Sequence, residues 1–203
     1  MAELPAPEGP NLRMRLASGL FTIAAFAGSF AGSGLRVRPI DGLASVAIAA
    51  AILFASIVAH ELGHLVAGLG AGYSFDFFKS GPLTVSRREG KLHVAFLERG
   101  GIRAIGLASV VPRTPDPSRR MRAVLVLGGP LASLSITAAG VVFLAAGGAG
   151  SPWSRFSAAF LAAHSFLTGF LNLVPYRSSG YPSDGLQLLE ILKKRQRGSA
   201  RAR

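Results

Sequence analysis

The sequence LASVAIAAAILFASIVAHELGH, from Leu43 to His64, joins a long apolar run to three ionisable side chains at its end. No charged residue occurs between Leu43 and Ala59. A helix needs about 20 predominantly apolar residues to cross a bilayer. On a helix, residues four apart lie on the same face, so His60 and His64 would project together. The stretch therefore predicts a membrane-spanning helix, about Gly42 to Leu69, that carries a polar site near its end.

Three further apolar segments have the length of a membrane span. They are about Leu16 to Leu35, Ala123 to Ala146 and Phe156 to Val174. Hydrophobic residues make up 50% of the 203 residues, charged residues only 16%, and the mean hydropathy is +0.42. A soluble domain carries about 25% charged residues. We predict an all-α polytopic membrane protein with about four transmembrane helices, built as one domain (1–203) and lying in the plasma membrane of a prokaryote.

The connection between the second and third spans, residues 73–122, has the alternation of strands rather than of helices. Tyr73–Phe78, Leu83–Ser86 and Leu92–Leu97 alternate, and Glu89-Gly90-Lys91 is a turn signal. Ile102–Val111 is too short to span, and it fits either a strand or a segment dipping into the interface. The connection therefore predicts a small membrane-associated β-sheet. A flexible tail (1–12) precedes the spans, and a short helix (Leu186–Lys194) and a basic tail (195–203) follow them.

The positive charges indicate the orientation. Nineteen of the 22 Lys and Arg residues lie in the N-terminal segment, the 73–122 connection or the C-terminal segment, which four spans place on one side. Positive loops favour the cytosol, so we expect both termini and the connection to be cytosolic.

The net charge of +12 fits a lipid surface, and no nucleic-acid-binding motif is present, so no nucleic-acid partner is expected. Arg13 and Arg15 before Leu16–Gly34 resemble a signal peptide, but the run is long and a second span follows closely, so we expect it to be retained.

His60-Glu61-Leu62-Gly63-His64 is an H-E-x-x-H sequence. Its two histidines can hold one metal ion, and Glu61 beside the first is placed to take a proton from water activated by that metal. The chain has no cysteine, so any Zn²⁺ site must use His and carboxylates. The alternative is a polar cluster that only pins helices together. Ionisable residues inside a membrane span more often mark function, because burying them is costly.

A zinc protease needs a third protein ligand, and four residues are candidates. His93 falls on a predicted strand, His164 lies in the middle of the fourth span, and Asp76 lies on the first strand. Asp184, in Pro182-Ser-Asp184-Gly185, follows the fourth span, whose end shares the predicted side with the histidines. We therefore expect Asp184 to be the third ligand.

Three sequence blocks resemble the site-2 protease family of intramembrane zinc metalloproteases, the M50 group. They are His60–His64, the block Gly128-Gly-Pro-Leu-Ala-Ser133, and Asn172-Leu-Val-Pro175 with Asp184-Gly185. The resemblance implies His60, His64 and Asp184 as zinc ligands, Glu61 as the general base, and hydrolysis of membrane protein or peptide substrates in the bilayer. It also implies that the strands after the second span can pair with an extended substrate.

Two departures from the family pattern are visible. Ser133 stands where the family usually has Asn, and the segment between Asn172 and Asp184 is longer than usual. Asn172 itself has two readings, a donor to the substrate oxyanion or a cap at the helix end.

The alternative function is a catalytically silent relative that binds membrane partners, which an intact Glu61 disfavours. A zinc-dependent membrane carrier is a further alternative, but the first and third spans lack the ionisable groups of a transport path.

Overall fold

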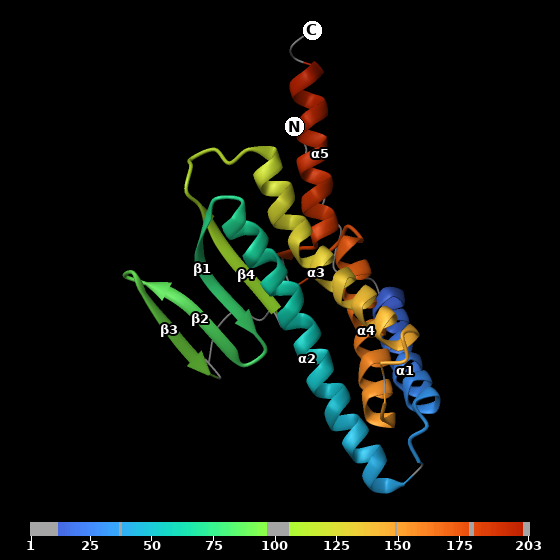
Figure 1. Ribbon diagram of the computed structural model, residues 1–203. Helices are drawn as coiled ribbons and strands as arrows, with labels where there is room; N and C mark the ends of the chain where they lie inside the picture. Colours follow the sequence, from blue (N-terminus) through green and yellow to red (C-terminus); the bar gives the residue numbers. More distant parts are fainter. Residues whose placement is uncertain (1–11, 37, 97–105, 149, 179–180, 201–203) are drawn as a thin grey trace.

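The computed structural model describes residues 12–36, 38–96, 106–148, 150–178 and 181–200, and it confirms a mostly helical chain with a small antiparallel sheet (Figure 1). Four helices are long and apolar enough to cross a membrane. They are α1 (Leu12–Ser33), α2 (Pro39–Gly70), α3 (Arg119–Ala145) and α4 (Pro152–Leu173). α2 and α4 begin a few residues earlier than predicted, because Pro39 and Pro152 occupy their first turns, where proline is tolerated.

The four helices alternate in direction. In Figure 1 the start of α1, the end of α2, the start of α3 and the end of α4 all point toward the upper end of the molecule. The sheet and the C-terminal helix α5 (Asp184–Ala200) therefore join the helices at one end. This arrangement agrees with the predicted sharing of one side by the connection and the C-terminal segment.

Helix α5 corrects the prediction for the C-terminal region. It was expected over Leu186–Lys194 and is 17 residues long, so residues 195–200 of the predicted basic tail are helical. The sequence after Lys194 continues with Arg-Gln-Arg, which are strong helix formers, before reaching Gly198. Of the other predicted tail, 1–12, only Leu12 is among the described residues. Residues 201–203 also lie outside the described residues.

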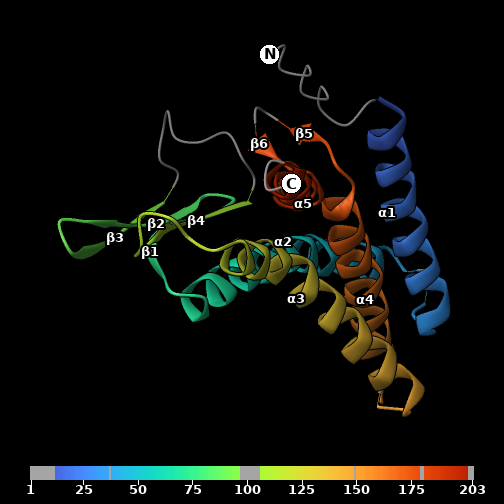
Figure 2. The same cartoon turned by 90° about the horizontal axis from the view of Figure 1, so that it is seen from above.

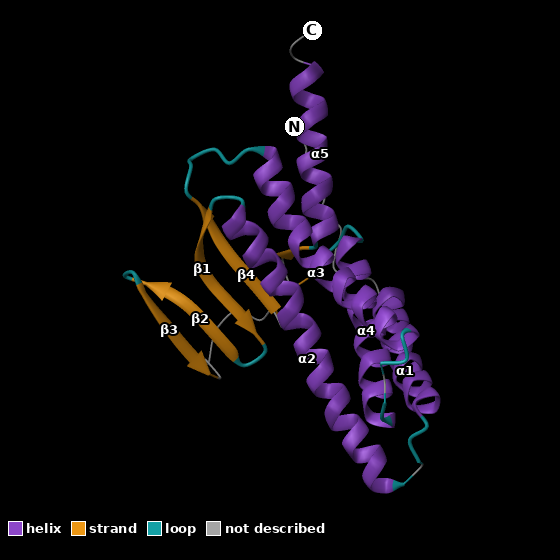
Figure 3. Ribbon diagram, viewed as in Figure 1, coloured by secondary structure: helices purple, strands orange, loops and turns teal. Residues whose placement is uncertain are grey.

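The sheet lies on one side of the helices, with α1 on the opposite side (Figures 2 and 3). Its strands are β1 (Tyr73–Ser80), β2 (Leu83–Arg88), β3 (Lys91–Phe96) and β4 (Gly106–Pro112), in the order β3-β2-β1-β4. All neighbours are antiparallel. The sequence left Ile102–Val111 open as a strand or a segment dipping into the interface. Its described part, from Gly106 on, is strand β4, whereas residues 97–105 lie outside the described residues.

Two local features follow from sequence. The β2–β3 hairpin turns at Glu89 and Gly90, which have φ values of 51° and 81°, and two successive positive φ angles match the twist of paired strands. β1 carries a bulge between Phe75 and Phe77, opposite β4. Bulges bend a strand and re-aim its side chains.

Helices α2 and α3 approach each other through two glycines. A Cβ on Gly63 would overlap the backbone of Gly128, and a Cβ on Gly128 would overlap the backbone of Gly63. Small residues at a helix interface permit such backbone contact. Any side chain at either position would therefore push the two helices apart. Because Gly63 lies between His60 and His64 in the sequence, this contact also places the two histidines next to the middle of α3.

The far ends of the helices are held by an apolar cluster. Phe156 and Phe160 of α4 are fully buried, and Phe26 and Phe30 of α1 pack against them. Ala49 of α2 completes this cluster. These aromatic contacts hold α1 against α4.

Candidate metal centre

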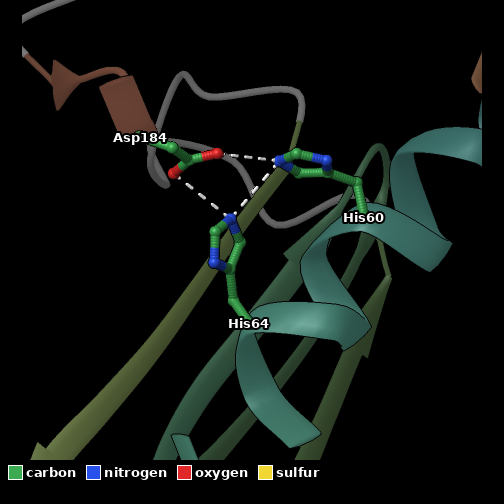
Figure 4. Close-up of side chains that lie close together, drawn as sticks. All are labelled: His60, His64 and Asp184. Atoms are coloured by element: carbon green, nitrogen blue, oxygen red, sulfur yellow. Dashed lines mark hydrogen bonds and ion pairs between the residues drawn. The ribbon is translucent and has the colours of Figure 1, made fainter. Parts of the chain in front are cut away.

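His60, His64 and Asp184 meet at one point, although 124 residues separate the first from the last (Figure 4). His60 Nε2 lies 3.1 Å from Asp184 Oδ2, and His64 Nε2 lies 3.3 Å from Asp184 Oδ1. The two Nε2 atoms are 3.3 Å apart. His60 is 3% exposed and Asp184 6% exposed. Three potential ligand atoms therefore converge at a site that is almost closed to solvent.

The opposite ring nitrogens have their own partners. His64 Nδ1 lies 2.9 Å from the carbonyl oxygen of Leu125, and His60 Nδ1 lies 2.9 Å from Ser133 Oγ. His64 Nδ1 also lies 3.3 Å from the Gly129 amide nitrogen, but its shorter contact is to the Leu125 carbonyl, which can only accept, so we assign the hydrogen to Nδ1. A neutral imidazole has one N–H, so this leaves the lone pair of His64 on Nε2, facing Asp184. Histidine ligands are commonly oriented in this way by a partner on the other ring nitrogen.

The donor set fits a zinc ion. Zinc–nitrogen and zinc–oxygen bonds of about 2.0–2.2 Å in a tetrahedron put ligand atoms about 3.3–3.6 Å apart. The two Nε2 atoms are 3.3 Å apart, within that range, and each of them lies 3.1 or 3.3 Å from one of the two carboxylate oxygens of Asp184. Two imidazole nitrogens and a carboxylate are also ligand types that zinc prefers. These three residues could hold a metal ion with three protein ligands and one open position.

Asp184 reaches the histidines because the chain folds back after α4. The longer segment before it forms a small hairpin of β5 (Arg177–Ser178) and β6 (Tyr181–Pro182). Ser183 closes the loop, since its N–H donates to the Tyr176 carbonyl at 2.8 Å. Its hydroxyl donates to the Val174 carbonyl at 2.7 Å and accepts the amides of Tyr176 and Leu186. The added residues therefore leave Asp184 beside the end of α4.

The carboxyl group of Asp184 is held in its ionised form. Burial raises its pKa, but the neighbouring His60 and His64 rings outweigh burial, and the resulting pKa is below the usual range for an Asp. Gly185 is required beside it, because a Cβ there would overlap the Leu173 carbonyl. The first turn of α5 thus presents a negative carboxylate packed tightly against the end of α4.

Glu61 lies beside the three residues but points to the sheet. Its Oε2 accepts the amide N–H of Ala108 in β4 at 2.9 Å. A Cβ on Gly106 would come within 3.0 Å of Glu61 Cγ and Oε1, so the strand passes close to the carboxylate. Since the Ala108 N–H points away from β1, the groups of β4 that face Glu61 belong to the outer edge of the sheet, which pairs with no strand among the described residues.

A cleft of about 730 Å³ opens in front of these residues. Its walls come from α2, β4, α3, α4, β6 and the start of α5, with Ser18 contributed by α1. Tyr176 lines the cleft, and its pKa is raised by burial and by the negative charge of Asp184. The cleft brings the metal-ligand cluster, Glu61 and an open strand edge into one space.

The other sequence candidates lie elsewhere. His93 is exposed on β3 and pairs with Ser86, and Asp76 accepts the hydroxyl of Ser109 at 2.9 Å. His164 lines the cleft from α4 but is not in the three-residue cluster. Asn172 also lines the cleft, and its amide donates to the Thr168 carbonyl one turn earlier at 3.0 Å.

Sequence reasoning missed several residues that shape the cluster. It set Ser133 aside because Asn is usual there, yet Ser133 contacts His60. It gave Gly129 no role at the metal cluster, whereas a Cβ on Gly129 would lie 2.7 Å from His60 Nε2 and overlap His64 Nε2. The proline of the same block interrupts the hydrogen bonds of α3 in this turn. The Gly-Pro block itself was therefore the available signal for contacts with the site.

Substitution of Gly129 by Ala is expected to weaken metal binding with little loss of fold. The new methyl group would occupy the space in front of both Nε2 atoms and displace the rings. Isothermal titration of the purified variant with zinc should show at least ~10-fold weaker binding, the lower end of what losing ligand orientation costs. Gly32→Ala in α1 is the matched control, because nothing lies within 4 Å of its Cβ position. Equal affinity in the Gly129 and Gly32 variants would contradict this placement of Gly129.

We compared the chain with protein-family models, curated proteins and solved structures to identify its family. The family model described as "Peptidase family M50" matches residues 48–157, which include His60, Glu61, His64 and the Gly-Pro block but not Asp184. No curated protein and no solved structure matches the chain. The family match covers more than half of the 203 residues, and it agrees with the four apolar helices and the cluster that could bind a metal. The chain belongs to peptidase family M50, the site-2 protease family.

Proposed function

We propose that the chain is an intramembrane zinc metalloendopeptidase in which His60, His64 and Asp184 hold Zn²⁺ and Glu61 is the general base. The observation that carries this proposal is the convergence of the three ligand atoms beside Glu61 in one cleft. Family membership supports metalloprotease chemistry, and the apolar helices support a bilayer as the site of reaction.

The residues around the cluster suit hydrolysis of an amide. Zinc in such a set supplies Lewis-acid activation of water and of the scissile carbonyl. Water attacks the carbonyl carbon, and Glu61 accepts the proton that water loses. Glu61 then gives this proton to the amide nitrogen, the C–N bond breaks, and a carboxylic acid and an amine are formed. Asn172, on the cleft wall, would donate to the carbonyl oxygen after turning away from Thr168.

The open edge of β4 suits a peptide substrate. Alternate backbone groups of an edge strand are free to pair with another strand, and the free edge of β4 faces Glu61. A transmembrane segment unwound along this edge would expose its amides to the site. Membrane protein and peptide substrates are therefore the class that we propose.

A catalytically silent relative remains the second candidate, and the structure gives a reason to set it below the protease. Such a protein has no use for a carboxylate beside the metal ligands. Glu61 is nevertheless fixed by Ala108 at the edge of the cleft, with one oxygen left for proton transfer.

We further propose that the β2–β3 hairpin contacts lipid, with both termini on the cytosolic side. Leu92, Val94 and Phe96 form one face of β3 and are 68%, 70% and 69% exposed. They pair with Arg87, Val85 and Leu83, whereas the other face carries Thr84, Ser86, Arg88, Lys91 and His93. The apolar face continues toward α2 through a groove of about 620 Å³ lined by Leu62, Leu65 and Leu69. Such a surface is costly in water and favourable against acyl chains.

Tryptophan quenching tests this lipid contact. Trp153 is the only tryptophan, so Trp153→Phe gives a silent background for Val94→Trp and, as matched control, His93→Trp. In liposomes with acyl-brominated lipids, Trp at position 94 should be quenched strongly and Trp at position 93 weakly, because neighbouring residues of a strand face opposite sides. Equal quenching at the two positions would rule out a one-sided lipid contact.

Mapping of new protein N-termini tests the proposed activity. Membranes from cells that express the wild type are compared with membranes from cells that express Glu61→Gln. The proposal expects new N-termini inside or beside apolar segments in the wild type only, and their loss when a zinc chelator is added. Identical N-termini in both samples, with the wild type loaded with zinc, would favour the silent relative.

A further inference from the structure

His60 is oriented by a side chain that family membership does not assign. Its Nδ1 lies 2.9 Å from Ser133 Oγ of α3, across 73 residues of sequence. Ser133 is only 1% exposed, and His60 is buried beside it. Water therefore has little access to this contact, and the hydroxyl is the group that meets the ring nitrogen.

Ser133 is itself held by packing. A Cβ on Gly169 of α4 would come within 3.1 Å of Ser133 Cβ, so α4 presses directly against this residue. The Ser133 carbonyl accepts the Thr137 hydroxyl at 3.0 Å, and the same hydroxyl lies 3.2 Å from the Ala162 carbonyl of α4. These contacts tie Ser133 to α4 and leave its hydroxyl pointing at α2.

The two histidines have different partners. The Leu125 carbonyl opposite His64 can only accept a hydrogen bond, so it holds one tautomer. A hydroxyl can donate or accept, so Ser133 can satisfy His60 Nδ1 in either tautomer. Without a metal, His60 Nε2–H can donate to Asp184 while Ser133 donates to Nδ1. With a metal on Nε2, the ring hydrogen would be on Nδ1, and this N–H would donate a hydrogen bond to Ser133 Oγ.

We propose that Ser133 is a positioning residue for His60, whose hydroxyl keeps the imidazole ring in one orientation in both the empty and the metal-loaded site. This inference rests on the proposed metal site. In the family this position usually carries Asn, so the serine is this chain's own solution to orienting the ligand. The metal can then load by moving one hydrogen, without a rotation of the ring.

Zinc affinity of Ser133→Ala, measured by competition with a chelator on full-length purified protein, tests the inference. Losing a partner of a histidine ligand costs about 10–100-fold in metal affinity, which is the expected effect. Ser165→Ala in α4 is the matched control, because Ser165 is also 1% exposed and its Oγ has no hydrogen-bond partner within the described residues. Zinc affinity of this control should equal that of the wild type.

Cobalt(II) supplies a second readout that does not depend on activity. The visible absorption of cobalt in the Ser133→Ala protein should shift or broaden relative to the wild type, because one imidazole is less fixed, whereas the Ser165→Ala spectrum should not change. Wild-type affinity and an unchanged cobalt spectrum in Ser133→Ala would overturn the inference and leave the proposed protease intact. Failure of the wild type itself to bind zinc would overturn both.

Discussion

Replacing Glu61 with Gln is expected to lower the rate of peptide-bond cleavage by about 10²–10⁴-fold, the usual contribution of a general base. Glutamine has the shape of glutamate, and its amide oxygen can still accept the Ala108 N–H. It cannot accept the proton that water must lose at neutral pH. Zinc content should stay at the wild-type value, because Glu61 is not in the three-residue ligand cluster.

The measurement is single-turnover cleavage of a membrane substrate found by N-terminal mapping, in detergent or nanodiscs, with zinc content recorded for each sample. Glu190→Gln is the matched control, since Glu190 is an exposed residue of α5 that pairs with Arg177 at 3.7 Å. The control should cleave at the wild-type rate. Cleavage by zinc-loaded Glu61→Gln within about twofold of the wild type would remove Glu61 from the mechanism.

The helices were the part of the fold that the sequence could predict. Long uncharged runs such as Leu43–Ala59 leave few alternatives, because an apolar segment of that length must be buried in protein or lipid. The strands followed from alternation, and the hairpin turn at Gly90 followed from residue type. These are local properties, which a single sequence carries.

The contacts between helices could not be predicted in the same way. An apolar helix does not indicate which of its faces meets a neighbour, so the crossing at Gly63 and Gly128 became definite only in the structure. The bond from Ser133 to His60 depends on that crossing. The Ala108 amide at Glu61 depends on strand register, and its residue type carries no signal at all.

The proximity of Asp184 to the two histidines is the one long-range contact that the sequence predicted. Topology placed Asp184 at the end of the fourth span on the side of the histidines, and the structure brings it within 3.1 Å of His60. The manner of its approach was not predictable, because the β5–β6 hairpin and the hydrogen bonds of Ser183 absorb the added residues.

Asp184→Ala is the second substitution for which we expect a large effect, namely loss of stoichiometric zinc. The variant keeps two imidazole ligands but removes the only negative charge from the three-residue cluster. Its fold should survive, because the hydrogen bonds of Ser183 hold the start of α5 independently of the Asp184 side chain. Asp76→Ala is the control, since Asp76 contacts Ser109 and is not in the cluster.

Metal analysis of the detergent-purified wild type beside Asp184→Ala tests the central claim most directly. We predict about one zinc per chain in the wild type and in Asp76→Ala, and far less than one in Asp184→Ala, as a three-ligand site requires. Absence of zinc from a carefully handled wild type, or full zinc in Asp184→Ala, would contradict the proposed centre.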